Sequence, residues 1–180
     1  MTRPSRNTSA ALQLISDPVD APLDPALPFL ASCLGPGTLE AVRRIAPHVL
    51  ESDFGDPRDR IIWGAITALS RDGASPTGQL VDGHLRRDGV YEFAPGQKLL
   101  ARRLVDVSSC RDGHPALLER LAADLLGLSF RRTVAEVGSG QAESALTSSE
   151  SDLWEHVKSG GANIRRIHER LSELRKTVPA

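Results

Sequence analysis

Lysine and aromatic residues are scarce in this sequence of 180 residues. Three of its 22 Lys and Arg residues are lysine, and Phe, Trp and Tyr together make up 4% of the chain. Runs of β-branched residues are also scarce, whereas Ala, Leu, Arg and Glu are plentiful. Because these four residues favour helices, the composition predicts an all-α protein.

The sequence also lacks the motifs of a nucleotide-hydrolysing enzyme. No G-x-x-x-x-G-K-[ST] phosphate-binding loop is present, and the GQK at residues 96–98 is its nearest approach. The DFG at residues 53–55 spells the magnesium-binding triplet of kinases, but the glycine-rich loop, the strand-borne lysine and the H-R-D motif are missing. We therefore expect that the protein neither binds nor hydrolyses ATP and has no catalytic residue.

Metal-site, signal and membrane patterns are absent as well. The five histidines show no ligand spacing, and Cys33 and Cys110 have no second cysteine or histidine near them, so we expect no metal and no cofactor. Two isolated thiols are typical of a reducing compartment. No apolar run is long enough to span a membrane, and the N-terminus lacks the apolar core of a signal peptide. These features predict a cytoplasmic protein without membrane contact.

The charge of the chain is nearly balanced, with a net value of −1. This balance provides no strong attraction to nucleic acid or to an anionic membrane. Pairs of adjacent arginines recur, but acidic residues lie near them and no aromatic residues are interleaved for base stacking. We interpret these pairs as solvated helix faces, so direct nucleic-acid binding is expected to be weak or absent.

Proline and helix-start signals divide the chain into three parts. Residues 1–23 are rich in proline and small polar residues, which predicts a disordered arm. Residues 24–110 carry short amphipathic patterns separated by glycine and proline, which predicts a helical globular subdomain. Residues 111–176 carry two longer apolar patterns, which predicts a helical hairpin that serves dimerisation. The helices expected in the globular subdomain begin near Pro25, Thr38, Pro57, Thr77 and Pro95, and the second of them is expected to end near Glu51.

The stretch SDFGDPRDRIIWGAI, residues 52–66, opens the third of these helices. Asp56 and Pro57 combine a capping oxygen with a proline in the first turn, and Asp59 stands where a carboxylate can reach back to the cap. Phe54 is interpreted as a plug that anchors the preceding turn on the core. These residues are expected to be structural, together with Ile62, Trp63 and Ile66 on the buried face of the helix.

The two longer patterns begin at Pro115 and Ser149. Gly138 and Gly140 weaken the first pattern, so the sequence leaves open whether that helix continues to about Leu146. Ser149 can cap the second helix, since an acidic residue follows three positions later. Two such helices joined by a short turn can fold back on each other as a hairpin.

The apolar residues of the two hairpin helices exceed what one partner helix can bury, which predicts a homodimer or a higher oligomer. Trp154 stands at the start of a polar helix, and two interpretations of it remain open: it closes the hairpin, or it anchors a partner. The residues expected to form the dimerisation or partner surface are Leu121, Leu125, Leu128, Leu153, Trp154 and Val157.

Between about residues 26 and 157, this order of features resembles the N-terminal domain of the DnaB-type bacterial replicative DNA helicase. The resemblance is carried by LPFLASCL, by ESDFGDPRDRIIWGAITALSRDGASP, by TGQLVDGHLRRDGVYE and by the long helix after HPALLERL. In that family a D-F loop leads into a helix of the form P-x-H-R-x-I-F-x-A-I, and a later helix ends in R-x-G-x-L/V-E. Matching residues include Asp53, Phe54, Pro57, Arg60, Trp63 and Ile66 for the first pattern, and Arg87, Gly89, Val90 and Glu92 for the second.

The sequence departs from the family pattern at Asp59, where the family has histidine, and at FAPGQ near residue 95, where a glycine pair is expected. It also ends at Ala180 before any ATPase domain. The resemblance therefore implies a collar domain without its motor, a non-catalytic module that dimerises and docks primase, helicase or a loader. The alternatives are a helical regulator or adaptor with an unrelated partner and, third, a small enzyme without a visible motif.

Overall fold

Helices form all of the regular secondary structure in the residues that the structure, a computed structural model, describes: 24–93 and 97–177. The predicted all-α class is therefore confirmed. The arm expected over residues 1–23 lies outside the described residues. In chain order the elements are α2 (Ala26–Cys33), α3 (Leu39–Ile45), the 3-10 turn η1 (Glu51–Asp53), α4 (Pro57–Arg71), α5 (Gly78–Arg87), α6 (Val90–Phe93), α7 (Gln97–Ser109), the 3-10 turn η2 (Pro115–Leu117), α8 (Leu118–Thr147) and α9 (Glu150–Thr177).

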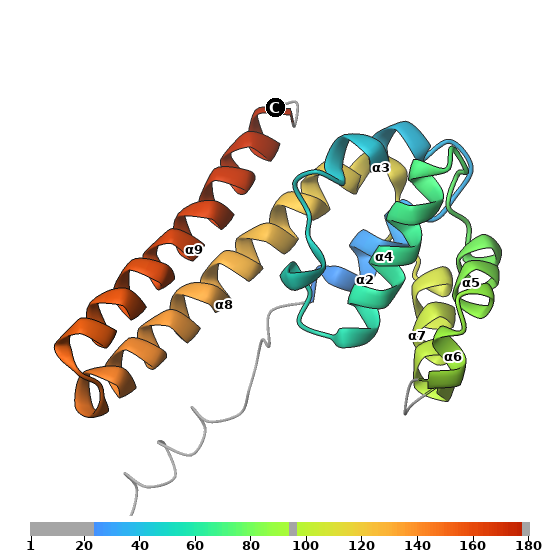
Figure 1. Ribbon diagram of the computed structural model, residues 1–180. Helices are drawn as coiled ribbons and strands as arrows, with labels where there is room; N and C mark the ends of the chain where they lie inside the picture. Colours follow the sequence, from blue (N-terminus) through green and yellow to red (C-terminus); the bar gives the residue numbers. More distant parts are fainter. Residues whose placement is uncertain (1–23, 94–96, 178–180) are drawn as a thin grey trace, which may run out of the picture.

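The described residues form a globule of short helices and a long hairpin that projects from it (Figure 1). Helices α2 to α7 pack against one another and form the globule. Helix α8 packs its N-terminal half against α2, α3 and η1, and then extends away from them beside α9. The predicted hairpin is thus present, and its two helices contact the globule only along part of their length.

Three aromatic rings occupy the centre of the globule. Phe29, Phe54 and Trp63 are buried, and their ring centroids lie 5.3 to 6.1 Å apart. Trp63 donates its indole N–H to the carbonyl oxygen of Val49 at 3.1 Å, so its one polar atom is satisfied. The surrounding aliphatic core includes Leu30, Val42, Ile45, Ile62, Ile66, Val81, Leu118 and Leu126.

The helix ends follow the local signals of the sequence. The Asp56 carboxylate accepts the N–H of Arg58 at the start of α4, and the Thr77 hydroxyl accepts the N–H of Leu80 in α5. Gly73 and Gly89 follow α4 and α5 with φ angles of 83° and 67°, which are strained for a residue with a Cβ atom.

One helix boundary differs from the prediction, and one that the sequence left open is now defined. The second helix was expected to reach about Glu51, but α3 ends at Ile45, because Pro47 has no N–H to continue the hydrogen-bond ladder. The open question about the long helix is resolved, since α8 continues through Gly138 and Gly140 to Thr147.

Candidate functional site

The hairpin is fixed to the globule by Asp53. This residue lies in η1, and its side chain is 1% exposed. Its carboxylate accepts two hydrogen bonds from the Arg170 guanidinium of α9, at 2.6 and 2.9 Å, and one from the Ser129 hydroxyl of α8 at 2.9 Å. It also accepts the backbone N–H of Leu50 at 2.7 Å. One buried carboxylate therefore joins both hairpin helices to the globule.

Three further hydrogen bonds strengthen this junction. Arg170 donates to the carbonyl oxygen of His48 at 2.7 Å, and Arg132 of α8 donates to the carbonyl oxygens of Ser52 and Asp53 at 3.2 and 3.0 Å. Sequence reasoning identified Asp53 only as part of the D-F pattern and did not identify Arg170. The two residues are 117 positions apart, so no local pattern relates them.

A second buried ion pair lies inside the globule and corrects a prediction. Asp59 was expected to reach back to the helix cap, but its carboxylate, which is fully buried, instead accepts two hydrogen bonds from Arg103 of α7, at 2.7 and 2.6 Å. Burial raises the pKa of the Asp59 carboxyl, and the guanidinium beside it acts in the opposite direction. The pair ties α4 to α7 and is structural.

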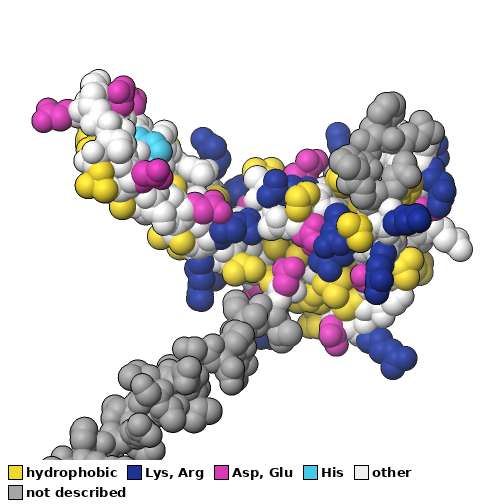
Figure 2. Space-filling view, turned by 90° about the horizontal axis from the view of Figure 1, so that it is seen from below, with side chains coloured by type: hydrophobic (Ala, Val, Ile, Leu, Met, Phe, Trp, Pro, Cys, Tyr) yellow, Lys and Arg dark blue, Asp and Glu magenta, His cyan; other side chains and the backbone are white. Residues whose placement is uncertain are grey.

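The outer half of the hairpin has no buried residue. The buried positions of α8 end at Thr133, and those of α9 begin at Ile167, so every residue of 134–166 is at least partly exposed. Large apolar side chains nevertheless lie on this half (Figure 2). Their exposed fractions are 87% for Leu146, 60% for Trp154, 41% for Val134 and 38% for Val157.

The six residues predicted for the partner surface lie in three different places. Leu125 is buried in the core of the globule and cannot reach a partner, which corrects its assignment. The apolar period of the helix was recognised, but one side of its first half faces α2. Leu121 and Leu128 are partly buried and line a groove of about 630 Å³ beside Leu27 and Pro28.

The other three predicted residues lie on the outer half of the hairpin. Leu153 is partly buried there, whereas Trp154 and Val157 are exposed. The indole of Trp154 therefore does not close the hairpin, which was one of the two interpretations left open. We define the exposed apolar residues Leu146, Trp154 and Val157 as the hairpin patch.

The two hairpin helices approach closely at glycine residues. A Cβ atom added to Gly160 of α9 would lie 2.6 Å from Cγ1 of Val137 on α8, and one added to Gly140 would lie 3.2 Å from Nε2 of His156. Because glycine has no Cβ atom, α8 and α9 can lie close together at these positions, and larger residues would push them apart. Close approach accounts for Gly140 and Gly160 only, since a Cβ atom at Gly127, Gly138 or Gly161 would meet nothing within 4 Å.

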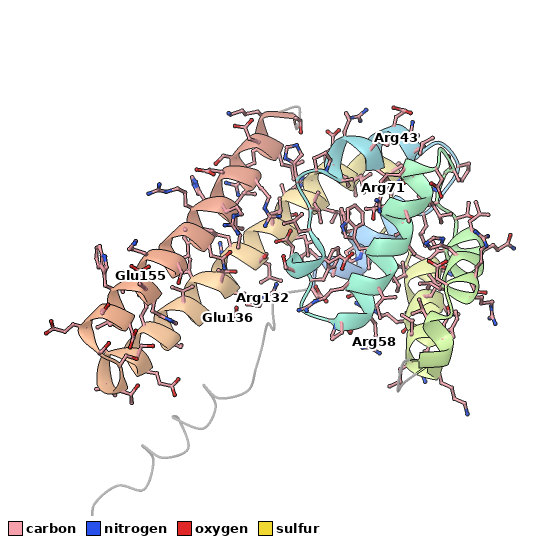
Figure 3. All side chains as sticks on the ribbon, in the orientation of Figure 1. Arg43, Arg58, Arg71, Arg132, Glu136 and Glu155 are labelled. Carbon is pink, nitrogen blue, oxygen red and sulfur yellow. The ribbon has the colours of Figure 1, made fainter. Side chains whose placement is uncertain are left out.

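The surroundings of the hairpin patch are acidic. Between residues 138 and 158, four carboxylates are found with one lysine, and that lysine, Lys158, forms an exposed ion pair with Glu155 at 3.0 Å. Glu155 lies on the outer half of α9 (Figure 3). The outer hairpin thus combines apolar side chains with negative charge, a composition that fits contact with protein better than contact with nucleic acid.

Nowhere in residues 24–93 and 97–177 do three His, Cys, Asp or Glu side chains gather in a way that could hold a metal ion. None of the described helices is both long and apolar enough to cross a membrane. No protein-family model matches the sequence, and a search of curated proteins also gave no match.

Proposed function

We propose that this chain is a non-catalytic protein-interaction module whose partner surface is the outer half of the hairpin. The observation that carries the proposal is the absence of any buried residue between positions 134 and 166, although Trp154 and three exposed aliphatic residues, Val134, Leu146 and Val157, lie there. An elongated surface with an exposed tryptophan is typical of a site that another protein covers.

The first partner that we propose is a second copy of the chain. The hairpin patch lies on the part of the hairpin that projects beyond the globule, so the patch is accessible to the hairpin of a second copy. A homodimer of this kind buries the same patch on both copies. The order of sequence features that resembles the helicase N-terminal domain supports this choice, because such domains dimerise through a helical hairpin.

The resemblance also supports a place in DNA replication, where the dimer docks the replicative helicase, primase or a loader. In the shared D-F pattern, Asp53 pairs with Arg170 of the hairpin and Phe54 is buried in the core of the globule. The resemblance therefore concerns residues that hold the hairpin in position on the globule. The second candidate, an adaptor with an unrelated partner, uses the same surface.

Light scattering at micromolar concentration tests the homodimer. We expect the mass of two chains for the parent protein and a monomer for Trp154→Ser. Leu99→Ser is the matched control, since Leu99 is 56% exposed but lies on α7 in the globule, and it should remain dimeric. A monomeric parent protein would reject the homodimer.

A pull-down with the replicative helicase and primase of the same organism separates the two candidates. Capture of either protein by the parent, and loss of capture in Trp154→Ser, supports a replication module. Capture of neither by a folded dimer favours the adaptor. DNA-stimulated ATP turnover by the pure protein would contradict the non-catalytic assignment.

A further inference from the structure

Four arginines line one small pocket where the hairpin meets the globule. The pocket has a volume of about 230 Å³ and lies between η1, the start of α4 and the middle of the hairpin, where residues 132–136 of α8 and 163–170 of α9 line it. Its charged and amide-bearing lining residues are Arg60, Arg132, Glu136, Asn163, Arg166 and Arg170. We propose that this arginine pocket binds a phosphate or diphosphate group.

Three of these arginines form hydrogen bonds with the protein, but these bonds use only some of their N–H groups. Arg170 is paired with Asp53. Arg60 donates its Nε–H to the carbonyl oxygen of Phe54 at 2.9 Å, and Arg132 donates to two carbonyl oxygens of η1. A carbonyl oxygen accepts a hydrogen bond but carries no net charge. The positive charges of Arg60 and Arg132 are therefore not neutralised by these contacts.

Arg166 has no structural role among the described residues. Its guanidinium forms no hydrogen bond and no ion pair within them, and yet it lines the pocket with the other three. It lies one residue before the buried Ile167, which packs the inner half of α9. Packing of the hairpin therefore places Arg166 at the pocket, but no described protein group uses its charge there.

Carboxylates do not balance the four positive charges. Asp53 is already held by Arg170, and Glu136 is the one acidic residue in the pocket lining. Glu136 is 68% exposed, and its carboxylate is 3.9 Å from Nε of Arg132, so the pair is weak (Figure 3). Four cations thus face two anions, which leaves an excess charge of two for a bound anion to neutralise.

Hydrogen-bond donors are also in surplus at this junction. Donor atoms on Arg60, Arg132 and Arg166 are unused. Guanidinium groups match the tetrahedral oxygens of phosphate and form charge-assisted hydrogen bonds with them, so a phosphate-type anion suits the unused donors of Arg60, Arg132 and Arg166.

The size of the pocket limits the ligand. Sites for drug-sized molecules occupy roughly 300 to 1,000 Å³, and this pocket is smaller. It accommodates one or two phosphate groups, either as a free anion or as the terminal group of a phosphorylated small molecule whose remainder stays outside. This inference does not depend on which protein covers the hairpin patch.

Isothermal titration calorimetry with four probes tests the inference at matched ionic strength in chloride. The probes are pyrophosphate, inorganic phosphate, adenosine 5′-monophosphate and adenosine. We expect binding of at least one phosphate-bearing probe and none of adenosine. Binding of the inorganic anions alone identifies a free anion as the ligand, and binding of the monophosphate alone identifies a phosphorylated small molecule.

The neighbouring arginines of α9 provide a matched pair of variants. Arg166→Gln removes a pocket charge, whereas Arg165→Gln removes an equally exposed charge that does not line the pocket. Loss of one charge-assisted contact should weaken binding about tenfold in Arg166→Gln, and the change in Arg165→Gln should stay below about twofold. Both variants should melt like the parent, because neither side chain holds the fold.

Three results would overturn the inference. The first is the absence of binding for every phosphate-bearing probe, and the second is an equal loss in both variants, which indicates general charge screening. The third is a change of mass in light scattering for Arg166→Gln without any phosphate binding, which assigns the pocket to a contact between copies of the chain.

Discussion

The Arg170 guanidinium forms two hydrogen bonds with the Asp53 carboxylate, at 2.6 and 2.9 Å, across 117 residues of sequence. Both side chains are largely buried, with exposed fractions of 14% and 1%. The pair therefore joins the end of the hairpin to the loop before α4. Because desolvated charges depend on their partner, removal of either side chain leaves the other in an unfavourable environment.

Asp53→Asn should lower the free energy of unfolding by about 3 to 5 kcal/mol, because it leaves the Arg170 guanidinium buried without its counter-charge. Urea denaturation followed by circular dichroism measures the change. Glu155→Gln is the control, since it breaks the exposed pair with Lys158 and should change stability by less than about 1 kcal/mol. Equal effects of the two substitutions would show that Asp53 does not hold the hairpin.

Local signals in the sequence were sufficient for most helix boundaries. Asp56 with Pro57, Thr77 and Ser149 each supply a cap whose hydrogen bond lies within three residues, so the pattern contains the whole interaction. The contacts of Asp59 and Asp53 could not be predicted in this way. Their arginine partners lie 44 and 117 residues away, and only the packed fold brings them together.

The partner surface on the hairpin was predicted only in part, because the sequence does not show which half of α8 packs on the globule. The apolar pattern of α8 continues beyond Leu128 at Val134 and Val137, but only the first half of the helix has a globule beside it. This difference buries Leu125 and leaves the outer half of the hairpin uncovered. Trp154 was identified because a tryptophan in a polar helix is unusual. The arginine pocket was missed, since Arg60, Arg132 and Arg166 come from three separate helices.

Two adjacent glycines of α9 should respond to alanine in opposite directions. Gly161→Ala meets nothing within 4 Å, so it should stabilise the protein by about 0.5 to 1 kcal/mol through better helix propensity. Gly160→Ala places a Cβ atom 2.6 Å from Cγ1 of Val137, whose branched side chain has little freedom to move. It should destabilise the protein by about 1 to 3 kcal/mol.

Thermal denaturation of the two glycine variants measures this difference. Val137→Ala removes the clashing methyl group, so the double variant Gly160→Ala, Val137→Ala should recover stability relative to Gly160→Ala alone. Stabilisation by both single alanine substitutions would mean that α8 and α9 are not in close contact at this point.

Tyr91 should ionise at unusually high pH. It is the one tyrosine of the sequence, so absorbance at alkaline pH reports it alone. Burial raises the pKa of its phenol to about 12, and the hydrogen bond that it donates to Asp82 at 2.9 Å acts in the same direction. Its contribution to stability is therefore fully present below pH 10, the ordinary value, and is lost as the pH rises through about 12.

Asp82→Asn removes the charged acceptor and should lower the pKa of Tyr91 towards its ordinary value of 10. Asp88→Asn is the control, because that carboxylate lies beside His84, at 3.3 Å, and should leave the titration of Tyr91 unchanged. A midpoint near pH 10 in the folded parent protein would contradict the partly buried hydrogen bond between Tyr91 and Asp82.

The last prediction separates stability from partner binding by comparing Asp56, Trp63 and Trp154. Asp56→Ala removes the cap of α4 and should cost about 1 kcal/mol of stability. Trp63→Ala empties the centre of the aromatic cluster, where the ring is 2% exposed, and should cost about 3 to 5 kcal/mol. Trp154→Ala should leave stability within about 0.5 kcal/mol of the parent, because the ring is 60% exposed.

Partner affinity should follow the opposite order. Asp56→Ala and Trp63→Ala, measured where they are folded, should keep the affinity of the parent, whereas Trp154→Ala should weaken binding, because its ring lies in the hairpin patch. Melting temperature and affinity are measured on the same samples of all three variants. If Trp63→Ala melts like the parent but loses its partner, the stretch from Ser52 to Ile66 is a recognition surface and the roles of the two tryptophans are reversed.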